Sequence, residues 1–290
     1  MSALVLCRFA HFMAVMLAFG ASAYLALAAP APLRRALSPP VRRLALIASL
    51  VALMTAILWL AFETASMADD WSAAIDLHMI RAVIADTAFG HAWLARLVLA
   101  AGLVAAFAVV PPRRWAAITL LSGLLLASLA LVGHAAMQTG YYGALHRANH
   151  AVHFIAAGAW IGGLIPFLLC LRVPSNDALA GEAVVAMTRF SDWGRYVVAA
   201  IVLSGVVNIA LISGRAPLPP TTPYRALLDA KIAIVAIMIA LALINRTWLA
   251  RRIFESAPAL AALKATSLIE VALGTVVVAL VSVFALFDPT

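Results

Sequence analysis

The sequence predicts an all-α, polytopic membrane protein in which residues 1–290 form a single integral membrane domain, a bundle of about eight transmembrane helices. Hydrophobic residues make up 66% of the chain and charged residues 11%, whereas a soluble domain has about 25% charged residues. The mean hydropathy is +1.06, which indicates that apolar side chains face lipid as well as the interior. Apolar stretches close to the roughly 20 residues that a helix needs to cross a bilayer recur along the chain.

The predicted spans follow one another through short connections, with no internal repeat. The first resembles a signal peptide, because Arg8 precedes the apolar run and Ala28-Ala29-Pro30 follows it. Its apolar run from Phe9 to Ala29 is longer than the roughly 7–15 residues of a signal-peptide core, so we predict a retained helix. The eight spans cover about residues 4–29, 44–62, 92–110, 115–133, 150–171, 196–213, 227–245 and 265–287.

The distribution of basic residues predicts the orientation. One set of loops carries 13 Lys and Arg residues and the opposite set carries 5. Cytoplasmic loops are enriched in Lys and Arg, so the richer set is predicted to be cytoplasmic and both termini to lie outside. The acidic character of the 63–91 connection agrees with an outer position.

This 63–91 connection is the longest one and holds four aspartates. Asp70 is suited to cap a helix that starts at Trp71, and Trp71, Ile75 and His78 then fall near one face. A short helix on the outer surface and a plain solvated loop are equally compatible with this pattern.

Charge and motif content exclude several classes of function. The net charge of +8 comes from short basic loops, so we expect no nucleic-acid partner. Cys7 and Cys170 fall in spans at opposite faces, too far apart for a disulfide. The sequence has no P-loop, dinucleotide loop, zinc-spaced cysteine pair or nucleophile elbow. We therefore expect no enzyme, and any transport would be passive, gradient-coupled or driven by a partner.

The histidines carry the strongest functional signal, because the predicted topology places all seven at or near the outer face. Imidazole suits copper and zinc, and thioether sulfur selects Cu(I). Positions 146, 150 and 153 share one helix face by their spacing of four and three. Bundles build metal sites from facing helices, so we predict a copper site from His11, His134, His153, His146, His150 and Met137.

Two other interpretations remain open at this point. Interfacial histidines also serve as polar anchors. Axial histidines on facing helices hold the haem b of membrane cytochromes, and His11, His134 and His153 fit that arrangement nearly as well as copper.

Further polar residues within the spans are expected to line a pathway or support packing, because such groups are costly in a membrane. For Glu270 the alternatives are a coupling carboxylate and an ion pair with Arg246 or Lys264, of which we favour the ion pair. Gly158 and Gly162 form a GxxxG pattern that permits close helix approach. The pathway or support candidates are Glu63, Arg96, Asn149, Asn208, Lys231 and Glu270.

Two segments give the sequence a family resemblance. Val132-Gly133-His134-Ala135 and the later run from His153 through Gly158-Ala159-Trp160-Ile161-Gly162-Gly163 resemble the copper resistance protein D family, as do Arg8 and His11-Phe12. The resemblance spans nearly the whole chain. The family pattern more often has an acidic residue where this chain has His150.

The resemblance implies a protein of the bacterial inner membrane with both termini on the periplasmic side and about eight helices in the lipid bilayer. It implies copper uptake and copper tolerance, with a small periplasmic copper-binding protein (CopC) as partner. It also implies His11, His134 and His153 as copper-pathway ligands. The alternatives are a cytochrome b-like electron-transfer protein and a scaffold that docks the periplasmic carrier without transporting copper.

Overall fold

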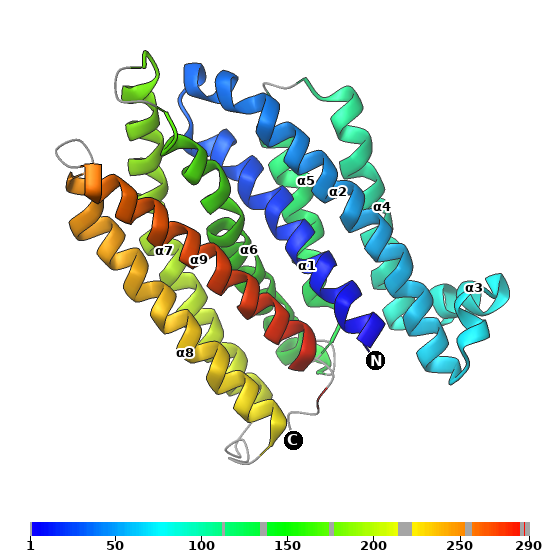
Figure 1. Ribbon diagram of the computed structural model, residues 1–290. Helices are drawn as coiled ribbons and strands as arrows, with labels where there is room; N and C mark the ends of the chain where they lie inside the picture. Colours follow the sequence, from blue (N-terminus) through cyan, green and yellow to red (C-terminus); the bar gives the residue numbers. More distant parts are fainter. Residues whose placement is uncertain are drawn as a thin grey trace.

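The computed structural model describes residues 2–111, 114–133, 138–173, 177–213, 222–252, 257–284 and 287. Within these ranges all regular structure is helical, which confirms the predicted polytopic bundle (Figure 1). The π-helical turns are η1 (Tyr24–Ala28) and η5 (Asn245–Leu249), and the 3-10 turns are η2 (Trp71–Ala74), η3 (Ser128–Leu131) and η6 (Ala250–Arg252). The α-helices are α1 (Ser2–Ala23), α2 (Ala31–Ala68), α3 (Leu77–Asp86), α4 (Ala88–Val109), α5 (Trp115–Ala127), α6 (Gly140–Cys170), α7 (Ala180–Ser213), α8 (Pro223–Ile244) and α9 (Ala257–Phe284).

Seven helices of the described chain are long and apolar enough to cross a membrane, and the segment Trp115–Leu131 is a shorter apolar helix. Several helices extend well beyond the predicted spans; α2 covers 38 residues and α6 covers 31. Hydropathy identifies only the part of a helix that lies in hydrocarbon. The backbone hydrogen bonds continue into the polar ends, such as the start of α2 around Arg34 and Arg35.

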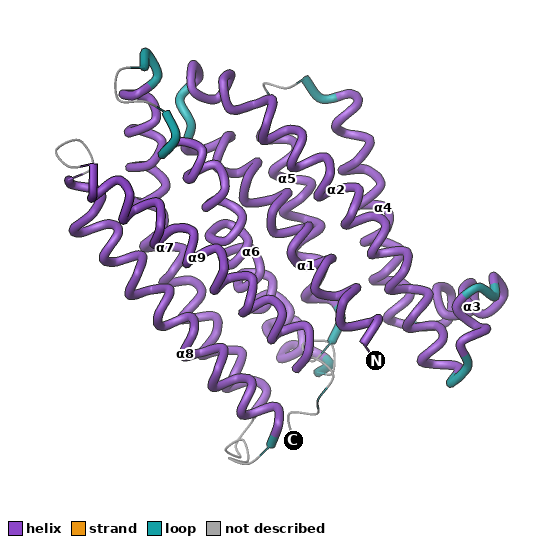
Figure 2. Tube along the Cα trace, viewed as in Figure 1, coloured by secondary structure: helices purple, strands orange, loops and turns teal. Residues whose placement is uncertain are grey.

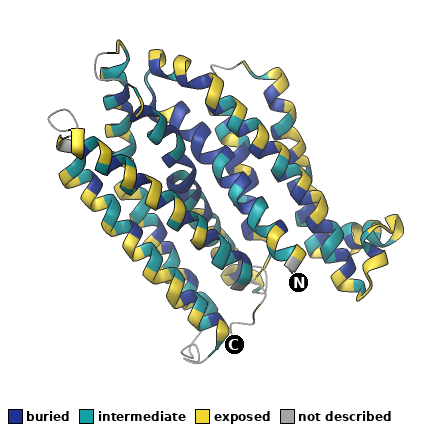
Figure 3. Ribbon diagram, in the orientation of Figure 1, coloured by how far each residue is buried: buried dark blue, intermediate teal, exposed yellow. Residues whose placement is uncertain are grey.

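The helices run up and down, joined by short connections (Figures 1 and 2), so that α1 begins and α9 ends at the same end of the bundle. We call this the N-terminal end. The central helix is α1, which packs against α2, α5, α6 and α9. Buried residues gather along α1 and the inner faces of its neighbours (Figure 3). The outer faces expose large apolar side chains such as Val98, Leu203 and Ile237, as expected for helices in lipid.

Helices α1 and α6 cross at glycines. An ideal Cβ on Gly20 would lie 2.6 Å from Gly162 Cα and closer still to the Gly158 carbonyl oxygen. A Cβ on Gly162 would lie 2.9 Å from Gly20 Cα and closer still to the Met16 carbonyl oxygen. The two backbones are therefore in direct contact, which confirms that the Gly158–Gly162 pattern permits close approach.

The 63–91 connection contains helix, and a helical turn does begin at Trp71 with Asp70 as its cap, but the longer α3 begins only at Leu77. Asp70 accepts a hydrogen bond from Ser72 N, yet the turn that it caps is the short η2. Asp76 accepts from His78 N and Met79 N and caps α3. The hydrogen bonds from the Ser72 hydroxyl and then from its N–H lower the pKa of Asp70, so this turn keeps its ionised cap on mild acidification.

Both cysteines are buried and free, as the topology predicted. Cys7 Sγ lies 3.2 Å from the Thr55 carbonyl oxygen, and Cys170 Sγ lies 3.2 Å from Tyr24 Oη. Each thiol contacts a neighbouring element of the core and acts there as a small packing residue.

Candidate functional site

A cavity of about 660 Å³ lies within the bundle, between the α6–α7 pair, the α8–α9 pair and α1. Its walls are mostly apolar. Some lining side chains, such as Val206 and Ile232, are also exposed on the outside of the bundle, so the cavity borders the bilayer. The charged and strongly polar residues on its wall are Arg8, Glu63, His150, His153, Asn208 and Lys231.

His153 projects from α6 to this cavity with a defined tautomer. Its Nδ1 lies 2.9 Å from Ser204 Oγ on α7. The Ser204 hydroxyl donates its single hydrogen to the Ala200 carbonyl oxygen at 2.5 Å, so its oxygen accepts from His153 Nδ1–H. The other ring nitrogen, Nε2, therefore carries a lone pair. A histidine whose Nδ1–H is held by an oxygen is the usual arrangement of a metal ligand.

The neighbouring amides hold α7 in place beside His153. Asn149 Nδ2 donates to the Ser204 carbonyl oxygen at 2.9 Å and to Asn208 Oδ1 at 2.8 Å. Asn149 and Asn208, expected from the sequence as pathway or support residues, thus form one polar seam between α6 and α7. The seam fixes the distance between Ser204 and His153, and the sequence alone did not identify Ser204 as the partner of that ring.

His11 is fully buried but faces α2 and does not line the cavity. Its Nδ1 lies 3.1 Å from the Ala52 carbonyl oxygen and 2.9 Å from Thr55 Oγ1. A carbonyl only accepts, so Nδ1 carries the hydrogen and Nε2 the lone pair. Nε2 is buried without a hydrogen-bond partner among the described residues. The positive charge of Arg96 acts on this ring, which disfavours a metal cation there.

Trp59 is the centre of a charged cluster at the N-terminal end. Its Nε1 donates to Glu63 Oε1 at 3.0 Å, and Arg8 Nη2 donates to the same oxygen at 3.0 Å. The Arg8 guanidinium lies 5.1 Å from the Trp59 ring centroid and that of Arg96 lies 6.0 Å away. Arg8 Nε and Nη1 are buried and have no hydrogen-bond partner in the described chain, so they offer donors beside the cavity.

Arg96 is fully buried and is held without a carboxylate. Its Nε and Nη2 donate to the hydroxyl and carbonyl oxygens of Ser128, and its guanidinium lies 4.2 Å from the Trp93 ring centroid. Glu63, the acidic candidate at this end of the bundle, pairs with Arg8.

The remaining histidines of α6 lie next to one another. The rings of His146 and His150 stack at 6.1 Å, and the rings of His150 and His153 meet edge to face at 6.5 Å. His146 is fully buried, while His150 lines the cavity and stacks on Phe154 at 4.6 Å. The predicted common helix face of these three residues is thus present.

The described residues do not assemble the complete predicted metal site. Among them, no three His, Cys, Asp or Glu side chains come close enough to hold one ion. His134 and Met137 lie outside the described residues. Gly133, which precedes His134 in the sequence, lines the cavity together with His153.

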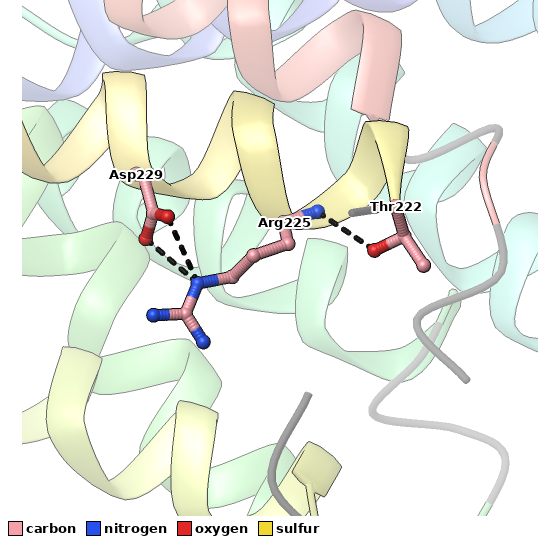
Figure 4. Close-up of polar contacts among 3 residues, drawn as sticks. All are labelled: Thr222, Arg225 and Asp229. Carbon is pink, nitrogen blue, oxygen red and sulfur yellow. Dashed lines mark hydrogen bonds and ion pairs between the residues drawn. The ribbon is translucent and has the colours of Figure 1, made fainter. Parts of the chain in front are cut away.

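The first turns of α8 hold an ion pair and a helix cap. Asp229 pairs with Arg225 at 2.9 Å, and Thr222 caps the helix by accepting from Arg225 N (Figure 4). Lys231 lines the cavity two residues further along. Its charge acts on His153 across that space.

The surroundings of Glu270 differ from the ion pair with Arg246 or Lys264 that the sequence favoured. Arg246 instead pairs with Asp192 at 2.9 Å, and no salt bridge in the described ranges joins Glu270 to Lys264. The Glu270 carboxyl is 2% exposed and accepts from Trp160 Nε1 at 3.1 Å and Asn245 Nδ2 at 2.6 Å. The favoured prediction was wrong because Arg246 turns toward α7, where Ser191 and Asp192 lie.

Comparison with known proteins gives matches over both halves of the chain. Residues 1–144 match the family model "Copper resistance protein D-like, N-terminal domain", and residues 184–284 match "Copper resistance protein D". The inner membrane protein YebZ of Escherichia coli (strain K12) is 34% identical over 285 residues, 97% of each chain. Copper resistance protein D of Pseudomonas syringae pv. tomato is 32% identical over 215 residues, 71% of this chain and 69% of the relative. No solved structure matches.

Proposed function

Because the chain belongs to the copper resistance protein D family, we propose that it is a multi-pass inner-membrane protein that takes up copper ions from the periplasmic side. Copper is the cargo of this process, and we propose no catalysed reaction. The names of the relatives are the basis for copper as the cargo and for the inner membrane as the location. The steps below concern how this chain's own residues serve that role.

The observation that carries the proposal is the lone pair of His153 Nε2 at the wall of an intramembrane cavity. Ser204 holds Nδ1–H, so the ring presents Nε2 without a rotamer or tautomer change. Neutral imidazole is a good ligand for copper in either oxidation state. A histidine within the membrane is energetically costly, so its presence there indicates a functional site.

The basic loops support a periplasmic entry. The connections expected from the sequence carry 13 Lys and Arg residues on the face that holds the start of α2 and 5 on the other face, which favours a cytoplasmic location for the richer face. The N-terminal end, where the described histidines lie, then faces the periplasm. A small periplasmic copper-binding protein is the expected donor at this surface, and the lipid bilayer surrounds the rest.

The test uses the purified wild-type chain in two assays. Elemental analysis after incubation with copper and removal of free ions is expected to find bound copper, and reconstituted vesicles are expected to accumulate it. Bound copper without accumulation would instead indicate the non-transporting scaffold. Copper no higher than in protein-free detergent micelles would overturn the proposal.

One observation favours a second candidate, a haem b protein. The cavity of about 660 Å³ with mostly apolar walls is far larger than an ion needs. His153 would hold the haem iron there, and Arg8 and Lys231 on the same wall would hold the propionates. A visible absorption spectrum of the purified protein distinguishes the candidates. A haem band that shifts on reduction would favour haem and count against copper as cargo.

Ser204→Ala is expected to weaken copper binding about tenfold, in the range known for residues that orient a metal-binding histidine. Without the Ser204 oxygen, His153 loses the acceptor that holds Nδ1–H. Copper affinity is measured by competition with a chelator. Ser49→Ala is the matched control, because Ser49 is a buried hydroxyl that donates to the Ala45 carbonyl of its own helix. Equal affinities for the two variants would contradict the orienting role.

A further inference from the structure

Glu270 sits behind the cavity wall that lies farthest from the N-terminal end. Trp160 lines the cavity with its ring and donates its indole N–H to Glu270 Oε2. Glu270 itself is buried on α9 and is not part of the cavity wall. The carboxyl group is therefore separated from the cavity by one side chain.

The second carboxyl oxygen belongs to a chain of three side chains. Asn245 Nδ2 lies 2.6 Å from Glu270 Oε1, and Asn245 Oδ1 lies 2.6 Å from Thr266 Oγ1. Thr266 Oγ1 in turn lies 2.9 Å from the Ala262 carbonyl oxygen. With the carboxyl ionised, Asn245 donates to Glu270, and the Thr266 hydroxyl donates to Asn245.

The same chain satisfies the protonated carboxyl when every hydrogen bond reverses. The Glu270 hydroxyl then donates to Asn245 Oδ1, the flipped amide donates to Thr266 Oγ1, and the Thr266 hydroxyl donates to the Ala262 carbonyl. No atom of the three side chains loses its partner in either state. A flip of the Asn245 amide and a rotation of the Thr266 hydroxyl hydrogen are thus the changes that accompany the gain of a proton.

The charged groups around α9 leave this carboxyl without a counter-ion. No salt bridge among the described residues includes Glu270, and those found join Arg8 to Glu63, Arg225 to Asp229 and Arg246 to Asp192. A buried carboxylate without a cation is costly, and taking up a proton removes that cost. The titratable or charged groups on elements that pack against α9, apart from those in these pairs, are Cys7, His11, Tyr141, Tyr142, His146, Arg147, His150, His153, Cys170, Tyr224, Lys231, Arg251 and Arg252, with Lys264 on α9 itself.

The backbone at Asn245 is also unusual. Asn245 begins the π-helical turn η5, which directly follows α8. Such turns insert an extra residue into a helix and occur frequently at functional sites. Here the turn lets Asn245 face Glu270 and Thr266 on α9.

We propose that Glu270 is a proton-binding site that exchanges one proton with the cytoplasmic side and couples proton movement to copper transfer through the cavity. The coupling rests on the proposed function, whereas the proton site does not. One proton converts the carboxylate to the acid and leaves again by the same route, with no change in oxidation state.

The proton site is tested without copper by infrared difference spectra of the reconstituted protein between alkaline and acidic buffer. Wild type is expected to show a band of a newly protonated, buried carboxyl group that Glu270→Gln lacks. Glu182→Gln, which alters a carboxylate at the start of α7, is the matched control and is expected to keep the band. Identical wild-type and Glu270→Gln spectra would overturn the proposal.

The coupling is tested by copper accumulation in vesicles with and without an imposed proton gradient. The gradient is expected to change the wild-type rate at least fivefold and to have no effect on Glu270→Gln, while copper affinity stays unchanged in both. Thr266→Val keeps the Glu270 carboxyl and the shape of the side chain at position 266, but it removes the hydroxyl at the end of the hydrogen-bond chain. This variant is expected to lose most of the gradient effect. An unchanged gradient response in Glu270→Gln would refute the coupling, whereas loss of copper binding by wild type would refute the proposed function instead.

Discussion

Replacement of His153 by alanine is expected to lower copper affinity on the order of 100-fold and to abolish uptake. The variant removes the Nε2 lone pair at the cavity, and loss of a ligand exceeds the roughly 10–100-fold effect of losing a residue that orients one. His153 is half-buried and contacts the Ser204 hydroxyl, which keeps its own helix bond to Ala200 in the variant. The variant should therefore fold. Copper content of the purified protein and uptake by vesicles are the two measurements.

His91→Ala is the control for this experiment. His91 is an exposed histidine at the same end of the bundle whose Nε2 lies 2.9 Å from the Ala85 carbonyl oxygen. It shares the residue type and the membrane face of His153 but not the cavity, so wild-type copper content is expected. A His153→Ala protein that keeps full copper content would show that the cavity is not the copper site.

Replacement of Gly20 by alanine is expected to prevent recovery of folded protein. The added methyl group would meet the backbone of α6 at Gly158 and Gly162, which cannot move aside as a side chain can. Overpacking typically costs about 1–3 kcal/mol, and more when backbones must separate. The central helix α1 would lose its contact with α6 and part of its contact with α9.

Gly102→Ala is the matched substitution, because a Cβ at Gly102 on α4 meets nothing within 4 Å. It is expected to be neutral or to stabilise the helix by about 0.5–1 kcal/mol. Yield of monodisperse protein and the midpoint of thermal unfolding in detergent compare the two variants. Equal yields and midpoints would disprove the backbone contact between α1 and α6.

The fold was largely predictable because the membrane imposes it. A run of about 20 apolar residues has few options other than a spanning helix, so the number and order of the helices followed from hydropathy. The helix ends did not, because α2 continues through Arg34, Arg35 and two prolines that hydropathy reads as a loop. The start of α3 was also missed, since Asp70 and Asp76 are both good caps and only the structure shows which one begins the helix.

The sequence predicted which residue types form the candidate site, but not which neighbouring helix each side chain faces. Sequence spacing placed His146, His150 and His153 on one face, and the structure agrees. Spacing does not say that His11 turns to α2 while His153 turns to α7, since that depends on how α1 and α6 rotate in the bundle. The hydroxyls that orient the two rings, Thr55 and Ser204, carry no sequence signal because both also bond to their own helices.

The openness of the cavity wall between α7 and α8 has a practical consequence. This wall includes Val202, Val206 and Ile232, which line the cavity and are also exposed on the outside of the bundle. Acyl chains and detergent tails therefore have access to the same space as a bound ion or cofactor. Occupancy of that space then depends on the amphiphile used to extract the protein. Purified samples in different detergents need not be equivalent, and a native-like lipid mixture is the reference against which they should be compared.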